Sequence, residues 1–75
     1  MNYTIKHAKS HGIIFSFDKS GNKYRCSMTE VATWKTIGAW TFDRYEEADA
    51  HFTAICKPYN AVIETVEHDS FPSFD

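Results

Sequence analysis

An apolar side chain at every second position of residues 13–18 and 23–29 is the feature that most constrains the fold of this chain. This period of two is the signature of a β-strand with one buried face. The residues between the two runs include Gly21 and Asn22, which readily take the positive φ angles that tight turns require. The sequence therefore predicts an antiparallel hairpin, whose buried face carries Ile13, Phe15, Phe17, Tyr24, Cys26 and Met28.

Three further segments are predicted to be strands. Residues 3–7 form a short first strand, and residues 34–42 form a longer one whose even-numbered positions share one face. Gly38 inside the longer strand indicates either a bulge or a large neighbour, such as a tryptophan, lying over it. Residues 59–66 are rich in Val and Ile and form the last strand.

A helix is predicted between Asp43 and Pro58. Asp43 is a favourable N-cap residue, and Glu46 three residues later completes an acidic version of the capping box. Lys57-Pro58 ends the helix because proline cannot continue the hydrogen-bond ladder. Apolar residues recur at three- and four-residue spacing and form one stripe, which consists of Tyr45, Ala48, Phe52, Ile55 and Cys56.

Together these elements predict an α+β fold, in which a small antiparallel sheet of about four to five strands packs on one amphipathic helix. The order is strand, strand, strand, strand, helix, strand. Seventy-five residues suffice for one domain, and six Phe, four Tyr and two Trp let so short a chain build a core. We expect the domain to span residues 1–66 and the acidic, aperiodic residues 67–75 to form a flexible tail.

Thiols and imidazoles do not occur at the spacing of a catalytic or metal site. Cys26 and Cys56 fall on the predicted core faces, where a thiol without a cationic neighbour is inert. No Cys-x-x-Cys or His-Glu-x-x-His pair brings metal ligands together, and the three glycines are too scattered to form a phosphate-binding loop. We therefore expect no enzymatic activity, no metal and no cofactor.

The chain opens with polar residues rather than with the apolar stretch of a signal peptide. No run approaches the roughly 18 apolar residues of a membrane span. A cytoplasmic, reduced setting without a membrane partner is expected, with the two cysteines behaving as small apolar residues rather than forming a disulfide.

Charge is distributed unevenly along the chain. The first 42 residues carry six Lys and Arg against two acidic residues, whereas the remainder carries two against eight. The outward faces of the strands gather Lys23, Arg25 and Lys35, with Lys6 nearby if the first strand pairs, and such a basic surface suits single-stranded nucleic acid. The aromatic residues alternate onto the opposite side and the domain is acidic overall, so direct nucleic-acid binding is the alternative hypothesis.

Protein binding is the principal hypothesis for this chain. One sheet face covered by a single helix leaves the other face in solvent, as a flat mixture of apolar and charged groups that suits a protein partner. Tyr3, Arg25 and Trp34 are of the residue types that commonly anchor such interfaces. An ordinary solvated sheet face would show half of the same pattern. Oligomeric state stays open, because an exposed edge strand can pair two copies.

Three short segments match features of a known family: the turn Ser20–Lys23, the element Ile37–Ala39, and Phe42-Asp43 opening an acidic helix that contains Glu46 and Phe52. In this arrangement residues 15–55 resemble phage-encoded anti-CRISPR proteins that inhibit type I-F surveillance complexes. Phe17 stands where that family has a tyrosine, and the N-terminal aromatic residue also differs.

The resemblance implies a cytoplasmic inhibitor that docks on a large bacterial nucleoprotein effector and blocks its engagement of nucleic acid. It also implies a partner-contacting role for Glu30, which lies after the hairpin where the family has an acidic residue. The mechanism would be steric occlusion, with the acidic helix or tail repelling or replacing phosphate. The predicted partner-binding residues are therefore Tyr3, Lys6, Lys23, Arg25, Glu30, Trp34 and Lys35.

Overall fold

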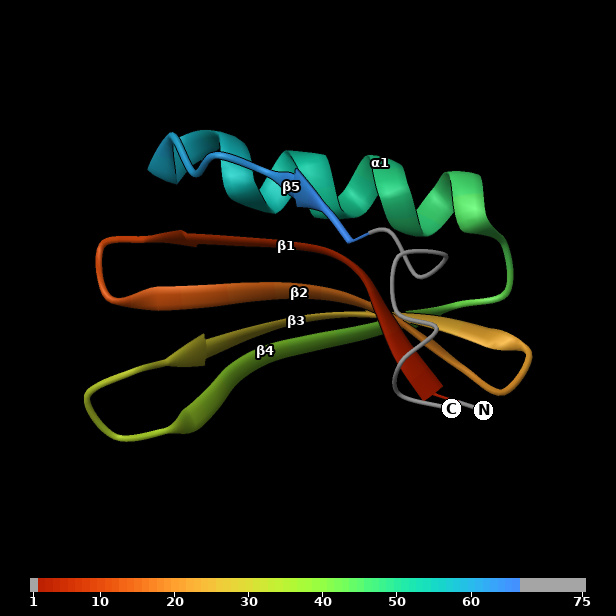
Figure 1. The fold of residues 1–75 in the computed structure, drawn as a ribbon, viewed down its shortest axis with the longest axis horizontal. Helices are drawn as coiled ribbons and strands as arrows, with labels where there is room; N and C mark the ends of the chain where they lie inside the picture. Colours follow the sequence, from red (N-terminus) through yellow and green to blue (C-terminus); the bar gives the residue numbers. More distant parts are fainter. Residues whose placement is uncertain (1, 67–75) are drawn as a thin grey trace.

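The computed structural model describes residues 2–66, which form one antiparallel sheet and one α-helix (Figure 1). The elements are β1 (Asn2–Ser10), β2 (Ile13–Ser20), β3 (Lys23–Glu30), β4 (Lys35–Phe42), α1 (Tyr45–Cys56), a 3-10 turn (Lys57–Tyr59) and β5 (Glu64–Thr65). In the sheet the strands lie in the order β4-β3-β2-β1-β5, and α1 covers one face. The predicted α+β fold and element order are confirmed.

Two-residue turns connect β1 to β2 and β2 to β3, and residues in these turns take positive φ angles. His11 and Gly12 (φ 53° and 72°) join β1 to β2, and Gly21 (φ 61°) lies in the turn between β2 and β3. Two-residue connections of this kind fit the twist of antiparallel strands. The predicted hairpin is confirmed, with Phe17 opposite Cys26.

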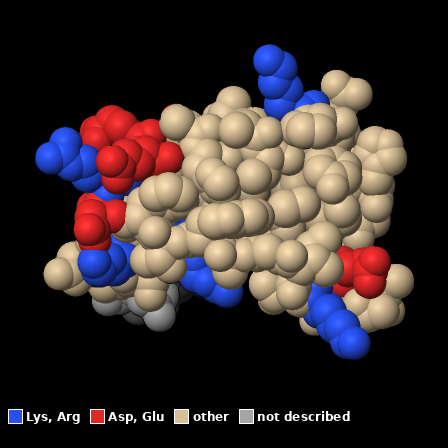
Figure 2. Space-filling view, turned by 180° about the vertical axis from the view of Figure 1, so that it is seen from behind, with Lys and Arg blue, Asp and Glu red and all other residues tan. Residues whose placement is uncertain are grey.

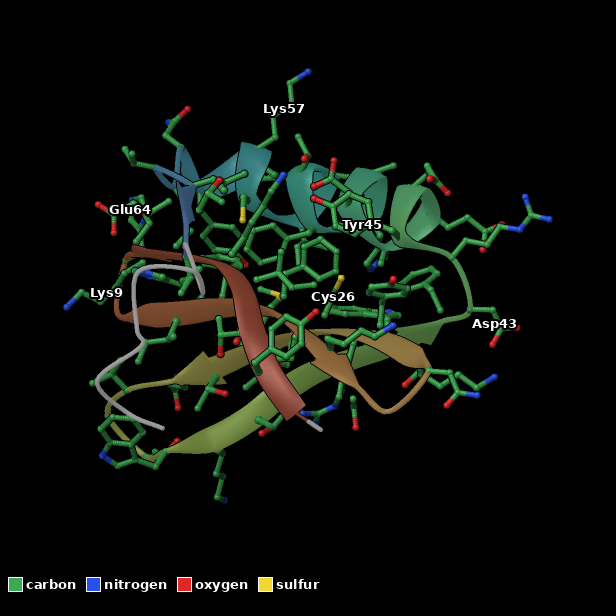
Figure 3. All side chains as sticks on the ribbon, turned by 45° about the vertical axis from the view of Figure 1, so that its right-hand side comes forward. Lys9, Cys26, Asp43, Tyr45, Lys57 and Glu64 are labelled. Carbon is green, nitrogen blue, oxygen red and sulfur yellow. The ribbon has the colours of Figure 1, made fainter. Side chains whose placement is uncertain are left out.

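The hydrophobic core lies between the sheet and α1. Its most deeply buried large side chains are Phe15, Phe17, Cys26, Phe52 and Cys56. The Phe17 ring centroid lies 5.7 Å from that of Phe52, and such aromatic pairs contribute about 0.5–1.5 kcal/mol beyond their area burial. Figure 3 shows Cys26 between the sheet and the helix. Both cysteines are free and buried, as predicted from their positions on the core faces.

Two β-bulges reset which side chains face the helix. One lies in β1 between Thr4 and Lys6, and the other leaves Ile37 of β4 without a partner on β3. Beyond a bulge, the alternation of faces is shifted by one residue. The Trp40 indole lies over Gly38, where an added Cβ would be 2.6 Å from Trp40 Cη2. Both features that Gly38 suggested, a bulge and an overlying tryptophan, are present.

The start of α1 differs from the prediction. The N-cap residue is Arg44, in extended conformation and without a capping hydrogen bond from its side chain. Asp43 lies one residue before this N-cap and accepts a hydrogen bond from Lys23 on β3, so the predicted acidic cap was wrong because the helix begins one residue too late for Asp43 to cap it. Glu46 and Glu47 do lie in the first turn, at the positive end of the helix dipole.

The last strand is shorter than predicted. Residues 57–59 continue α1 as a 3-10 turn that contains Pro58, and Asn60 takes a left-handed conformation (φ 52°). Ala61 and Ile63 then pack against the core, which leaves only Glu64–Thr65 paired with β1. The predicted tail, residues 67–75, lies outside the described residues. Over residues 2–66, no helix is long and apolar enough to cross a membrane.

Candidate functional site

The sheet face turned away from α1 is called the open face here, because no described helix or strand packs on it. Strand pairing arranges most of its side chains in three rows across β1 to β4, and Ser20 opposite Lys23 lies beyond them at one end. The rows are Thr4, Asp18, Arg25 and Thr41; His7, Ser16, Ser27 and Ala39; and Lys9, Ile14, Thr29 and Thr36. The middle row consists mostly of small side chains, and Ser27 at its centre is 6% exposed.

The predicted partner-binding residues do not gather on this face. Lys23 and Arg25 belong to it, but Lys6 pairs with Phe17 in a row that faces the helix. The Lys6 Nζ donates to Asp49 Oδ1 on α1 at 2.6 Å, and this hydrogen bond raises the pKa of Lys6. Lys6 therefore links β1 to α1 through Asp49. Simple alternation along β1 assigns Lys6 to the wrong face, because the bulge between Thr4 and Lys6 shifts the alternation by one residue.

Lys35 is also displaced by a bulge. The register shift at Ile37 places Lys35 opposite Glu30, so Lys35 does not continue the row of Ala39 and Thr41. Tyr3 lies opposite Lys19, in a row whose other members face the helix.

Three of the predicted residues do come together at the end of the β3–β4 hairpin. We call Glu30–Lys35 the hairpin tip. Trp34 N–H donates to the Glu30 carbonyl at 2.7 Å, and Thr33 Oγ1 donates to Glu30 Oε1 at 2.8 Å. Trp34 is held at φ 58° and is 70% exposed. The tip thus presents a large apolar side chain on a hydrogen-bonded turn.

A cleft of about 270 Å³ lies near the opposite end of β3, at the edge of the open face. It brings Tyr3 and Arg25 together with Asp18, a residue that the sequence analysis did not single out. Asp18 Oδ1 accepts hydrogen bonds from Thr4 Oγ1 (2.9 Å) and Ser16 Oγ (2.8 Å), which fix the carboxylate beside Arg25. The two-residue turn at Gly21-Asn22 was the available signal, since it sets Asp18 opposite Arg25.

A second cleft, of about 460 Å³, lies where the residues before β5 run beside β1. Its walls include Lys9 and Ile14 of the open face and Val62, which is 75% exposed. In Figure 3 the Lys9 side chain extends outward from the body of the molecule. This cleft is mixed in polarity, and it also contains His7 and Glu64, whose Nε2 and Oε1 atoms lie 3.4 Å apart.

The thiols are buried and protonated. Burial raises the pKa of Cys26 to about 12 and that of Cys56 to about 11. The Cys26 thiol also donates to the Ala48 carbonyl at 3.2 Å. A thiol in this state is a poor nucleophile. Within the described part of the chain, no three His, Cys, Asp or Glu side chains gather in a group able to hold a metal ion.

Charged side chains gather at two ends of the molecule on the side away from β5, with a broad uncharged surface between them (Figure 2). Lys23 and Asp43 form an ion pair across β3 and the segment before α1. Together with Lys6–Asp49, this pair engages two of the four predicted surface cations with carboxylates.

Comparison with protein-family models, with curated proteins and with solved structures finds no match to this chain.

Proposed function

We propose that this chain is a non-enzymatic protein-binding module that uses its open face and the adjoining hairpin tip. The observation that carries the proposal is Trp34, a large apolar side chain exposed in a left-handed backbone conformation. For a bulky residue this conformation is uncommon and costs on the order of 1 kcal/mol. A partner that buries the Trp34 indole would account for a turn in which Trp34 is both strained and exposed.

The size of the surface is consistent with such a role. Four strands at about 4.8 Å spacing and eight residues at about 3.3 Å rise give an open face of roughly 500 Å². A standard interface buries about 800 Å² on each partner, so the hairpin tip would supply the remainder. Ile37 on β4, which is 52% exposed, lies between the tip and the small side chains of the middle row. An interface of this size with one aromatic anchor fits the pattern in which few residues carry most of the affinity.

Direct nucleic-acid binding has less support from the geometry. Lys6 and Lys23 are engaged by Asp49 and Asp43, and the three described rows of the open face contain no Phe, Tyr or Trp on which bases could stack. Arg25 and Lys9 are the cations that remain for phosphate on these rows.

The resemblance to anti-CRISPR proteins supports a narrower form of the proposal, in which the partner is a bacterial nucleoprotein effector. Glu30 would then contact the partner from the hairpin tip, and Glu46 and Glu47 would repel the nucleic acid that the partner normally binds. A type I-F interference assay tests this form directly: restored phage growth supports it, and unimpaired interference contradicts it.

Photo-crosslinking tests the general proposal. A photoreactive residue at Ile37 is expected to give one specific protein adduct in bacterial cells, whereas the same residue at Ala50, on the exposed side of α1, is expected to give none. Trp34→Ala should abolish the adduct, because it removes the proposed anchor. Thr53→Ala is the control, since Thr53 is exposed on α1, on the opposite side of the sheet from the open face, and the change should leave the adduct intact.

Two results would overturn the proposal. One is an adduct at Ile37 that survives Trp34→Ala. The other is binding of purified chain to single-stranded DNA or RNA that weakens steeply with salt, which is the mark of phosphate contacts and favours the nucleic-acid alternative.

A further inference from the structure

The cleft of about 270 Å³ beside Arg25 lies at the end of the sheet where β1 begins, β2 ends and β3 begins (Figure 1). Its walls come from these three strands and consist of Tyr3, Thr4, Asp18, Lys19, Ser20 and Arg25. Strand pairing sets Asp18 opposite Arg25, so a carboxylate and a guanidinium lie on neighbouring strands. The volume is slightly below the roughly 300–1,000 Å³ of pockets for drug-sized molecules, which suits a ligand of about the size of one amino acid.

The Asp18 carboxylate is oriented by two uncharged donors. Thr4 Oγ1 and Ser16 Oγ both donate to Asp18 Oδ1, at 2.9 and 2.8 Å, whereas Oδ2 accepts no hydrogen bond from residues 2–66. Because hydroxyl groups carry no charge, these two hydrogen bonds fix the direction of the carboxylate and leave its negative charge in place. Asp18 Oδ2 therefore remains able to accept hydrogen bonds from a cationic group.

The Arg25 guanidinium lies beside this carboxylate without being bound to it. Arg25 is exposed, and its side chain forms no ion pair and no hydrogen bond with the described residues. The five N–H groups of a guanidinium form a planar fork, which binds a carboxylate through two parallel hydrogen bonds. One cleft thus offers a cation with unused donors next to an anion with an unused oxygen.

We propose that this cleft binds a free α-amino acid as its zwitterion, with the ligand carboxylate on Arg25 and the ligand ammonium on Asp18 Oδ2. This inference is independent of the proposed function. Directly opposed residues of antiparallel strands have Cβ atoms about 4.5–5.5 Å apart, so one small ligand can reach both side chains. A ligand with a single charge is disfavoured, because the cleft residue of the same sign repels it. The terminus of a peptide carries only one of the two charges, which restricts the ligand to a free amino acid.

NMR titration of the full chain tests the proposal, because it detects millimolar binding and locates it on the chain. L-Phenylalanine is the first probe, since Tyr3 gives the cleft an aromatic wall. It is expected to shift the backbone amide signals of Asp18, Lys19 and Arg25, with a Kd of about 1 mM or below. N-Acetyl-L-phenylalanine lacks the ammonium and L-phenylalaninamide lacks the carboxylate, and each is expected to bind about ten-fold more weakly because one charged hydrogen-bond partner is lost.

Two variants that remove one charge each should exchange these preferences. Asp18→Asn keeps an acceptor for Thr4 and Ser16 but loses the negative charge, so it should bind L-phenylalanine about ten-fold more weakly and N-acetyl-L-phenylalanine more tightly than the wild-type chain does. Arg25→Gln should instead gain affinity for L-phenylalaninamide. A gain of affinity cannot arise from a variant that fails to fold. Lys9→Gln, which removes an exposed cation outside this cleft, should leave all three affinities unchanged.

Three results would overturn the proposal. One is that none of the standard free amino acids binds with a Kd below about 10 mM. Another is equal affinity of the wild-type chain for L-phenylalanine and for either derivative, since the cleft would then recognise a single charge. The third is a set of shifted signals that lies wholly outside the cleft.

Discussion

Gly38→Ala is the substitution for which the structure makes the sharpest prediction. The new methyl group would lie 2.6 Å from Trp40 Cη2, 3.1 Å from Cζ3 and 3.3 Å from Cζ2. The indole cannot simply swing away, because His51 lies against it with ring centroids 4.6 Å apart. Overpacking of this kind costs about 1–3 kcal/mol, and in a domain of this size each kcal/mol lowers Tm by about 4–8 °C. We expect a loss of about 2 kcal/mol, or ~8–16 °C.

A double-mutant cycle tests the assigned cause. In a Trp40→Leu background the obstructing ring is gone, and Gly38→Ala should then stabilise the chain by about 0.5–1 kcal/mol because alanine restricts the unfolded backbone more than glycine does. The sign of the substitution should therefore reverse, as measured by urea unfolding of dilute protein. Equal destabilisation in both backgrounds would refute the steric explanation.

The other predictions concern the two buried thiols and two ion pairs. Because burial raises the pKa of Cys26 to about 12 and of Cys56 to about 11, the native chain holds these protons more tightly than the unfolded chain, whose thiols titrate near 9. Stability from this source is complete below pH 9 and falls as pH rises toward 11–12, which urea unfolding across that range measures; stability that increases there would contradict it. At pH 8 a thiol reagent should label neither cysteine until the chain unfolds. Asp49→Asn should cost at most about 1 kcal/mol by removing the partner of Lys6, whereas Lys23→Ala, in the more exposed pair, should stay within about 0.5 kcal/mol in the same assay.

Local patterns predict the β2–β3 hairpin and the core well, because period-two alternation and a glycine turn fix both the faces and the register of two adjacent strands. The same reasoning located both thiols in the core and associated Gly38 with an overlying tryptophan. These features depend on residues that are close in the sequence or on a single side chain, so they can be predicted from the sequence alone.

The candidate site was predicted less well, because a bulge is decided by how two strands fit together. The bulges at residues 4–6 and at Ile37 move Lys6 and Lys35 out of the rows that alternation assigns to them. The sequence pattern predicts Asp43 as a helix cap, yet the N-cap is Arg44, and the Asp43 carboxylate accepts a hydrogen bond from Lys23 of β3. Of the predicted surface, Lys23 and Arg25 do lie on the open face, and Glu30, Trp34 and Lys35 come together at the hairpin tip.

The two-residue length of β5 bears on the order in which the chain folds. β1 to β4 form a meander of neighbours, whereas β5 must return to β1 across 59 positions, from Thr65 to Lys6. Closing a loop of that length rather than a two-residue turn costs about 3 kcal/mol more in chain entropy, which so short a ladder does not offset on its own. Docking of α1 reduces the open segment to the few residues after Cys56. We therefore expect β5 to join last and to open first, so that amide exchange at Glu64 and Thr65 should be the fastest in the sheet.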